Sequence, residues 1–136
     1  MRQKTKIYEY KSYWSQERDL GKYTEIKKQN IIYALKPFSF STVLEIGPGQ
    51  GELTRLLLDN FPIEKIQCVD ISRWYLLQLP KNPILKKTQA DILEFDTQER
   101  FDLVISAHLL LHIEPENLSL VYNKMKSFSK KSNIKS

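Results

Sequence analysis

The sequence predicts an α/β fold in which short buried strands alternate with helices. The first indication is a strand–loop–helix unit at residues 42–57, where an apolar run leads into a glycine-rich loop and then into leucines at helical spacing. The second is a series of apolar runs at residues 66–70, 84–90 and 101–106, each with the length of a strand. The third is that proline and capping residues separate these runs.

Helices are expected on both sides of these strands. Thr24 is a suitable N-cap for a helix that ends before Pro37, and Ser72 for a helix that ends near Pro80. A last helix is expected to begin near Pro115. The apolar positions of the first helix are Ile26, Ile31, Ala34 and Leu35, and those of the last are Leu118, Val121, Tyr122 and Met125. Lys86 and Lys87 predict that the strand at residues 84–90 lies at a sheet edge.

The loop after the first strand has glycine at every second position. Backbone without side chains lets a ligand approach closely, and the following helix directs unpaired N–H groups towards it. The dinucleotide fingerprint would need another glycine where this chain has Glu52. Glu45 would repel a pyrophosphate and attract a cationic group, and Pro48 lacks an N–H that a phosphate cradle would use. The loop therefore predicts a nucleoside ligand that carries a positive charge.

This motif resembles the first motif of the class I S-adenosylmethionine-dependent methyltransferases, an acidic residue followed by Gly-x-Gly-x-Gly. Here the pattern is Glu45, Gly47, Gly49 and Gly51. The resemblance covers about residues 8–130 and implies a Rossmann-like three-layer sandwich with a mostly parallel sheet. It also implies S-adenosylmethionine as the cofactor, without a metal or a covalent intermediate. The alternative for the motif alone is a tight strand–helix turn that binds nothing.

Residues after the later strands match further cofactor positions of this family. Asp70 ends the second strand, where a carboxylate can accept hydrogen bonds from both ribose hydroxyls; alternatively, it stabilises a helix N-terminus. Ile71 would then pack against adenine. Asp91 and Ile92 match the residues that bind the adenine amino group and ring. The predicted cofactor-binding residues are Glu45, Gly47, Gly49, Gly51, Asp70, Ile71, Asp91, Ile92 and Ser106.

The segment after the fourth strand bears on the methyl acceptor. His112 and Ile113 resemble a helical turn of the small-molecule branch of the family, which favours a small-molecule acceptor. His108 lies nearer the strand tip and is a candidate general base, since histidine titrates near neutral pH. The alternative is that His108 has no chemical role, and a structural role is expected for His112.

An RNA or protein acceptor is the first rival hypothesis. The opening motif, through Leu53 and Thr54, also resembles that of the ribosomal RNA adenine dimethylases. Those enzymes carry an Asn-Leu-Pro-Tyr motif where this chain has Ser106-Ala107-His108-Leu109. Residues 1–36 and 117–136 each have a net charge of +5, which permits attraction to nucleic acid or simply promotes solubility. A second rival is a non-catalytic half-fold that binds the cofactor or a partner protein, and a nucleotide-binding oxidoreductase is a distant third.

The 136 residues are expected to form one domain in three parts: an N-terminal helical arm or lid at 1–36, a cofactor-binding domain at 37–130 and a polar tail at 131–136. The single cysteine, Cys68, excludes an internal disulfide and gives no metal-site spacing. The chain has neither a long apolar run nor an apolar signal core, so we expect a cytoplasmic protein.

The family's sheet has seven strands, whereas this chain ends after the helix that follows the fourth. We therefore expect a sheet truncated after about four strands, with an unpaired edge at residues 101–106. The apolar run from Leu103 to Ile105 would recruit a second copy of the chain or a complementing chain. We expect either a dimer through this edge or marginal stability, and weak turnover in both cases, because the acceptor pocket would be incomplete.

Overall fold

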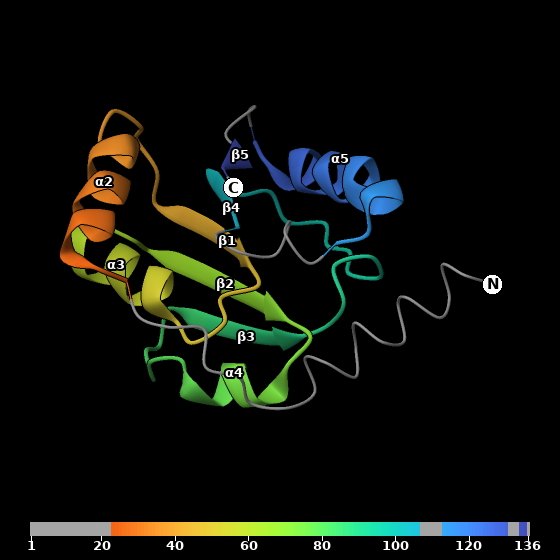
Figure 1. The fold of residues 1–136 in the computed structure, drawn as a ribbon, viewed down its shortest axis with the longest axis horizontal. Coiled ribbons are helices and arrows are strands. Elements are labelled where there is room, and N and C mark those ends of the chain that lie inside the picture. The colour runs from red at the N-terminus through yellow and green to blue at the C-terminus, as the bar shows by residue number, and fades with distance from the viewer. Residues whose placement is uncertain (1–22, 107–112, 131–133, 136) are drawn as a thin grey trace.

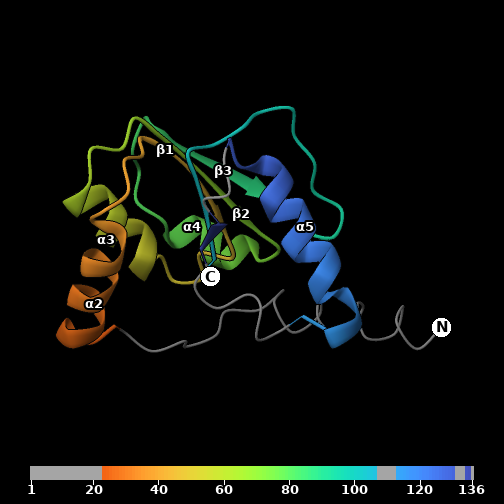
Figure 2. The same cartoon turned by 90° about the horizontal axis from the view of Figure 1, so that it is seen from above.

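The computed structural model describes residues 23–106, 113–130 and 134–135. It is a three-layer α/β structure in which helices lie on both faces of one sheet (Figure 1; Figure 2). This confirms the predicted fold class. The elements in chain order are α2 (Glu25–Leu35), β1 (Thr42–Ile46), α3 (Glu52–Asn60), β2 (Lys65–Asp70), α4 (Arg73–Gln78), β3 (Leu85–Gln89), β4 (Leu103–Ile105), the short 3-10 helix η2 (Pro115–Asn117), α5 (Leu118–Phe128) and β5 (Ile134–Lys135). None of the helices within these ranges is long and apolar enough to cross a membrane.

The strands lie in the order β3-β2-β1-β4-β5, and all neighbouring strands are parallel. The chain moves outwards from β1 to β3 and then crosses back to place β4 on the other side of β1. The strand order thus reverses beside β1. Open α/β sheets bind their ligands at the carboxyl end of the strands near such a reversal. The topology therefore places the glycine loop after β1 at the expected ligand site.

The inner strands β1, β2 and β4 are buried on both faces, which explains why they are mostly apolar. On one face, here called the α3 face, Val43, Ile66 and Leu103 pack with the buried residues of α3 and α4. On the other, the α5 face, Leu44 and Val104 pack with the buried residues of α5. Successive strand residues thus contribute to opposite cores.

The predicted edge strand at residues 84–90 is confirmed, but the predicted open edge at residues 101–106 is wrong. β3 pairs only with β2 within the described sheet, and its Lys86 and Lys87 are exposed. β4, by contrast, pairs on its outer side with β5, which lies in the segment predicted to be a polar tail. Unpaired backbone groups beside a strand favour the addition of another one, and here the chain supplies it. A dimer through the edge of β4 stays a prediction, but the unpaired edge from which it was inferred is paired with β5.

Local capping residues place two of the helices as predicted. The Thr24 hydroxyl accepts a hydrogen bond from the Lys27 backbone N–H at 3.1 Å, and the Ser72 hydroxyl accepts one from Tyr75 at 3.4 Å. Gly51 precedes α3 and makes no such side-chain cap. The helix behind the glycine loop therefore begins without the usual side-chain acceptor.

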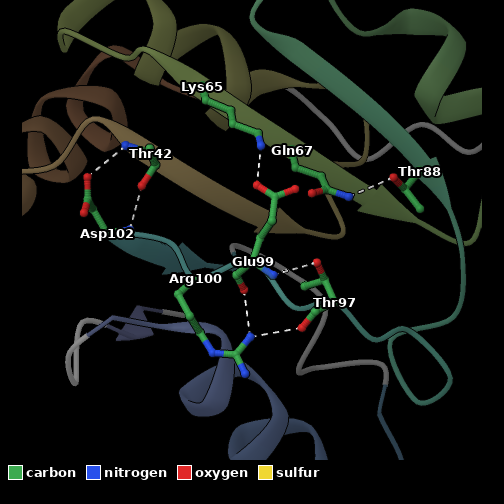
Figure 3. Close-up of polar contacts among 8 residues, drawn as sticks. All are labelled: Thr42, Lys65, Gln67, Thr88, Thr97, Glu99, Arg100 and Asp102. Carbon is green, nitrogen blue, oxygen red and sulfur yellow. Dashed lines mark hydrogen bonds and ion pairs between the residues drawn. The ribbon is translucent and has the colours of Figure 1, made fainter.

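Asp102 joins the starts of β1 and β4 (Figure 3). Its Oδ2 accepts hydrogen bonds from the backbone N–H groups of Ser41 and Thr42 at 3.0 and 3.1 Å, while its own N–H donates to Thr42 Oγ1 at 2.8 Å. Lys130, just after α5, lies 3.2 Å from the other carboxylate oxygen. The Ser41 N–H, followed by the other donors, holds the pKa of Asp102 well below its usual range. One carboxylate thus fixes three segments at the amino end of the sheet.

Replacing Asp102 with Asn should lower the free energy of unfolding by about 1.5–3 kcal/mol at pH 7, because the backbone donors lose a charged acceptor. Urea unfolding of the Asp102→Asn and parent proteins measures the difference. The carboxylate stabilises the fold above its unfolded pKa of about 3.9, and this contribution is lost as the pH falls through the lower folded pKa. The difference in the free energy of unfolding between the two proteins should therefore be largest at pH 7 and decrease below pH 4.

The exposed Asp96, which accepts a local bond from the Thr97 N–H, provides the control variant Asp96→Asn. That change should alter stability by no more than about 0.5 kcal/mol. Equal effects of the two substitutions would show that Asp102 does not hold these segments together.

Candidate functional site

The glycine loop is a fixed turn that only glycine accommodates easily. The φ angles of Gly47, Gly49 and Gly51 are 70°, 57° and 85°, all in the left-handed region that strains other residues. The Gly47 N–H donates to the Val69 carbonyl at 2.8 Å, and the Gly51 N–H donates to the Pro48 carbonyl at 3.0 Å. The first bond anchors the loop to β2, and the second closes the turn before α3.

Asp70, at the end of β2, contacts the glycine loop directly. Its Oδ2 accepts a hydrogen bond from the Gly49 N–H at 3.2 Å, and its Oδ1 accepts one from the Ser72 N–H at 2.8 Å. Burial raises the pKa of Asp70 to about 6, although the N–H donors, Ser72 first, oppose this rise. The contact with Ser72 also supports the start of α4, so the alternative role at a helix N-terminus is present as well. Each oxygen retains further acceptor capacity for a ligand.

Glu45 is completely buried beneath the N-terminal turn of α3. Its Oε1 accepts a hydrogen bond from the Thr54 hydroxyl at 2.5 Å, and the Cys68 thiol lies 3.7 Å from the same oxygen. Its Oε2 has no hydrogen-bond partner within the described residues. Burial, with a smaller contribution from the Asp70 charge, raises the pKa of Glu45 to about 7. A buried carboxyl oxygen without a partner is costly unless a ligand or water satisfies it.

Two other predicted site residues have the same property. Asp91 follows β3, where its Oδ1 accepts a hydrogen bond from the Leu93 N–H at 2.9 Å while its buried Oδ2 has no partner in the described ranges. Ser106 follows β4, and its buried hydroxyl likewise lacks a partner there. The carboxyl ends of parallel strands lie at the same end of a sheet. The structure therefore brings Glu45, Asp70, Asp91 and Ser106 together at the carboxyl end of the sheet.

The remaining predicted residues have different positions. Ile71 is half-buried after β2, whereas Ile92 is buried in the α5-face core beside Val69 and Phe95. His108 and His112 lie outside the described residues. A surface hollow of about 440 Å³ lies between α2 and α3, and none of its lining residues is a predicted site residue.

Sequence reasoning missed the residues that support Glu45. Thr54 lies on the buried side of α3 among leucines, and this polar position in an apolar face was the available signal. Tyr23 is half-buried against the α3-face core; burial, with the charges of Glu45 and Glu52, raises its pKa to about 12. The Glu45 and Glu52 carboxylates flank the glycine loop, and their charges reach Tyr23.

Comparison with known proteins identifies the family. Residues 43–132 match the family model described as a methyltransferase domain. Two curated proteins are similar over 70 residues: the ribosomal RNA small subunit methyltransferase A of Herminiimonas arsenicoxydans, at 40% identity, and that of Janthinobacterium sp. (strain Marseille), at 37%. Each match covers 49% of this chain and 27% of the relative, so the chain matches about a quarter of these proteins' length.

Solved structures show the same fold at lower identity. The N-methyltransferase NodS from Bradyrhizobium japonicum WM9, in complex with S-adenosyl-L-homocysteine, has a TM-score of 0.69 at 19% identity over 93% of this chain and 67% of NodS. The amino pentose methyltransferase CalS10 from Micromonospora echinaspora, with bound S-adenosylmethionine, has a TM-score of 0.65 at 18% identity over 90% and 51% of the two chains. The chain therefore belongs to the methyltransferase domain family and has the Rossmann-like fold of the class I S-adenosylmethionine-dependent methyltransferases.

Proposed function

We propose that this chain binds S-adenosylmethionine at the carboxyl end of its sheet and transfers the methyl group to a small-molecule acceptor. One observation carries the cofactor assignment: Glu45 Oε2, Asp91 Oδ2 and Ser106 Oγ are buried without partners in the described part of the chain. Buried polar atoms in native proteins are nearly always hydrogen-bonded. A polar ligand at this edge would satisfy all three.

The chemistry of these groups fits the parts of the cofactor. Asp70, held against Gly49, offers carboxylate oxygens to the ribose hydroxyls. Asp91 offers an acceptor to the adenine amino group. Glu45 offers a negative charge to the cationic part of the molecule, and the glycine loop lets the ligand approach the backbone.

The bound cofactor supplies an activated methyl group on its sulfonium centre, so the protein has to orient the reactants and exclude water. Asp70 and Asp91 would fix the nucleoside, and the buried strand ends would keep solvent away from it. A general base is needed only for an acceptor that is protonated at neutral pH. His108 remains the candidate for that role. The segment 1–36 remains the candidate for a lid over the cofactor. Tyr23 belongs to this segment and packs against the α3-face core, and its pKa is raised in part by the charges of Glu45 and Glu52, which supports the lid.

The acceptor hypothesis rests on the segment after β4. The sequence Ser106-Ala107-His108-Leu109 lacks the amide and aromatic groups that grip an exocyclic amine in the RNA adenine dimethylases. An RNA acceptor is the second candidate, because both curated relatives are named as ribosomal RNA methyltransferases. Transfer of labelled methyl groups to extracted RNA, and to extracted metabolites below 1 kDa, would separate the two. RNA labelling together with RNA binding that weakens steeply with salt would contradict the small-molecule hypothesis.

Replacing Asp70 with Ala should weaken binding of S-adenosylhomocysteine by about 1.5–3 kcal/mol, because two ribose hydroxyls lose a charged acceptor. Calorimetric titration measures the loss, and a melting curve verifies that the variant is folded. Asp70→Asn, which keeps one acceptor oxygen for the Gly49 N–H, should give a smaller loss. Unchanged affinity in a folded Asp70→Ala protein would remove Asp70 from the site.

Cofactor binding should release protons near pH 6.5. The pKa values of Glu45 and Asp70 are raised to about 7 and about 6, so both carboxyls are partly protonated at this pH. A cationic ligand and hydroxyl donors favour the ionised forms, which lowers both pKa values on binding. Affinity should therefore rise from pH 5.5 to pH 8 and then level off.

Calorimetry of S-adenosylmethionine binding in two buffers with different ionisation enthalpies gives the number of protons released. Glu45→Gln should reduce the release at pH 6.5 and flatten the pH dependence, because glutamine does not titrate. Proton uptake in the parent protein, or equal release in both proteins, would contradict the assigned role of Glu45.

A further inference from the structure

Arg55 links the glycine loop to the end of α4. This arginine lies on α3, one turn after Gly51, and its side chain is exposed. Its Nη1 donates to the Gln50 carbonyl at 2.7 Å, and its Nη2 donates to the Gln78 carbonyl at 2.8 Å. Gln50 lies inside the glycine loop, whereas Gln78 is the last residue of α4. A single guanidinium thus holds two segments that are separate in sequence.

The space around Gly51 depends on the same side chain. A Cβ atom on Gly51 would lie 2.9 Å from Arg55 Nη1 and 2.9 Å from Leu79 Cδ2, closer than side-chain atoms normally approach. Leu79 belongs to the buried α3-face core. Gly51 is therefore enclosed between a core leucine and the arginine, and the loop has little room to move away from α4.

The second link between these segments is the bond from the Gly49 N–H to Asp70, whose other oxygen accepts a bond from the N–H of Ser72, the N-cap of α4. Loop and helix are thus joined at two places: through Asp70 before α4 and through Arg55 at its end. Loss of the Arg55 bonds would remove one of these two links, and the other link, through Asp70, belongs to the proposed cofactor site.

We infer that Arg55 is a positioning residue for the cofactor site: it holds the glycine loop at the distance from Asp70 and Ile71 that the nucleoside requires. This inference rests on the proposed cofactor binding. The planar guanidinium presents donors in a fixed fork, so it reaches both carbonyls at once, whereas the single ammonium of lysine reaches only one. The carbonyl at the end of α4 also favours a cation, because terminal helix carbonyls lack intrahelical partners.

The test compares Arg55→Met with Arg100→Met. Arg100 is a matched control, because its exposed guanidinium also donates to two carbonyls, those of Thr97 and Glu99 at 3.0 and 2.8 Å, but in the β3–β4 connection (Figure 3). Arg55→Met should weaken S-adenosylhomocysteine binding about tenfold or more, equivalent to about 1.4 kcal/mol. Arg100→Met should leave the Kd within about twofold, a difference of about 0.4 kcal/mol. Arg55→Lys should fall between the parent protein and Arg55→Met.

A second measurement separates positioning from a general loss of stability and does not need the cofactor. Hydrogen exchange of the Gly49 and Gly51 amides in the ligand-free protein should be faster in Arg55→Met than in the parent and in Arg100→Met. Melting temperatures of the ligand-free proteins should stay similar. If the parent protein bound no cofactor, the proposed function would fail while the exchange data still showed whether Arg55 holds the loop. Cofactor binding with unchanged Kd and unchanged exchange in Arg55→Met would overturn the inference.

Discussion

The hydrogen bond from the Gly49 N–H to the Asp70 carboxylate is the contact on which the site depends. It exists because β1 and β2 pair in parallel with Ile46 opposite Val69, so the loop after one strand meets the last residue of the other. A shift of one residue in this register would turn Asp70 to the opposite face. The two apolar cores prevent that shift, because alternate residues of both strands are buried on opposite faces. Packing of the sheet therefore fixes the geometry of the polar site.

The two ends of the sheet use carboxylates in opposite ways. At the amino end, Asp102 is surrounded by donors and its pKa is lowered, so its charge stabilises the fold. At the carboxyl end, burial raises the pKa values of Glu45 and Asp70, so ionising them costs stability in the ligand-free protein. Carboxyls kept at such a cost are typical of functional sites, where a ligand compensates for it.

The sequence was sufficient where local chemistry decides the structure. Short apolar runs predicted the four main strands, and the hydroxyls of Thr24 and Ser72 predicted two helix starts. Asp70 was predicted to end the second strand, and it is the last residue of β2. The sequence was not sufficient to predict features that depend on tertiary packing. Ile26 and Tyr122 were assigned to apolar helix faces but are 76% and 53% exposed. The buried residues are Leu35 in α2 and Val121, Met125 and Phe128 in α5. Cys68, which lies against Glu45, and Gln78, which accepts a bond from Arg55, are each 23 residues away in sequence, and periodicity does not reveal such contacts. The same holds for β5, which is too short to give a strand pattern.

We propose that the carboxyl end of the sheet recognises a cationic nucleoside and rejects a pyrophosphate. Glu45 supports this claim through its charge, and the loop supports it through Pro48, which provides no N–H. Calorimetric titration of the parent protein with S-adenosylmethionine, S-adenosylhomocysteine and NAD, side by side under one condition, tests it most directly. We expect saturable binding of the first two and no measurable binding of NAD. Binding of NAD as tight as that of S-adenosylmethionine, or binding of none of the three, would contradict it.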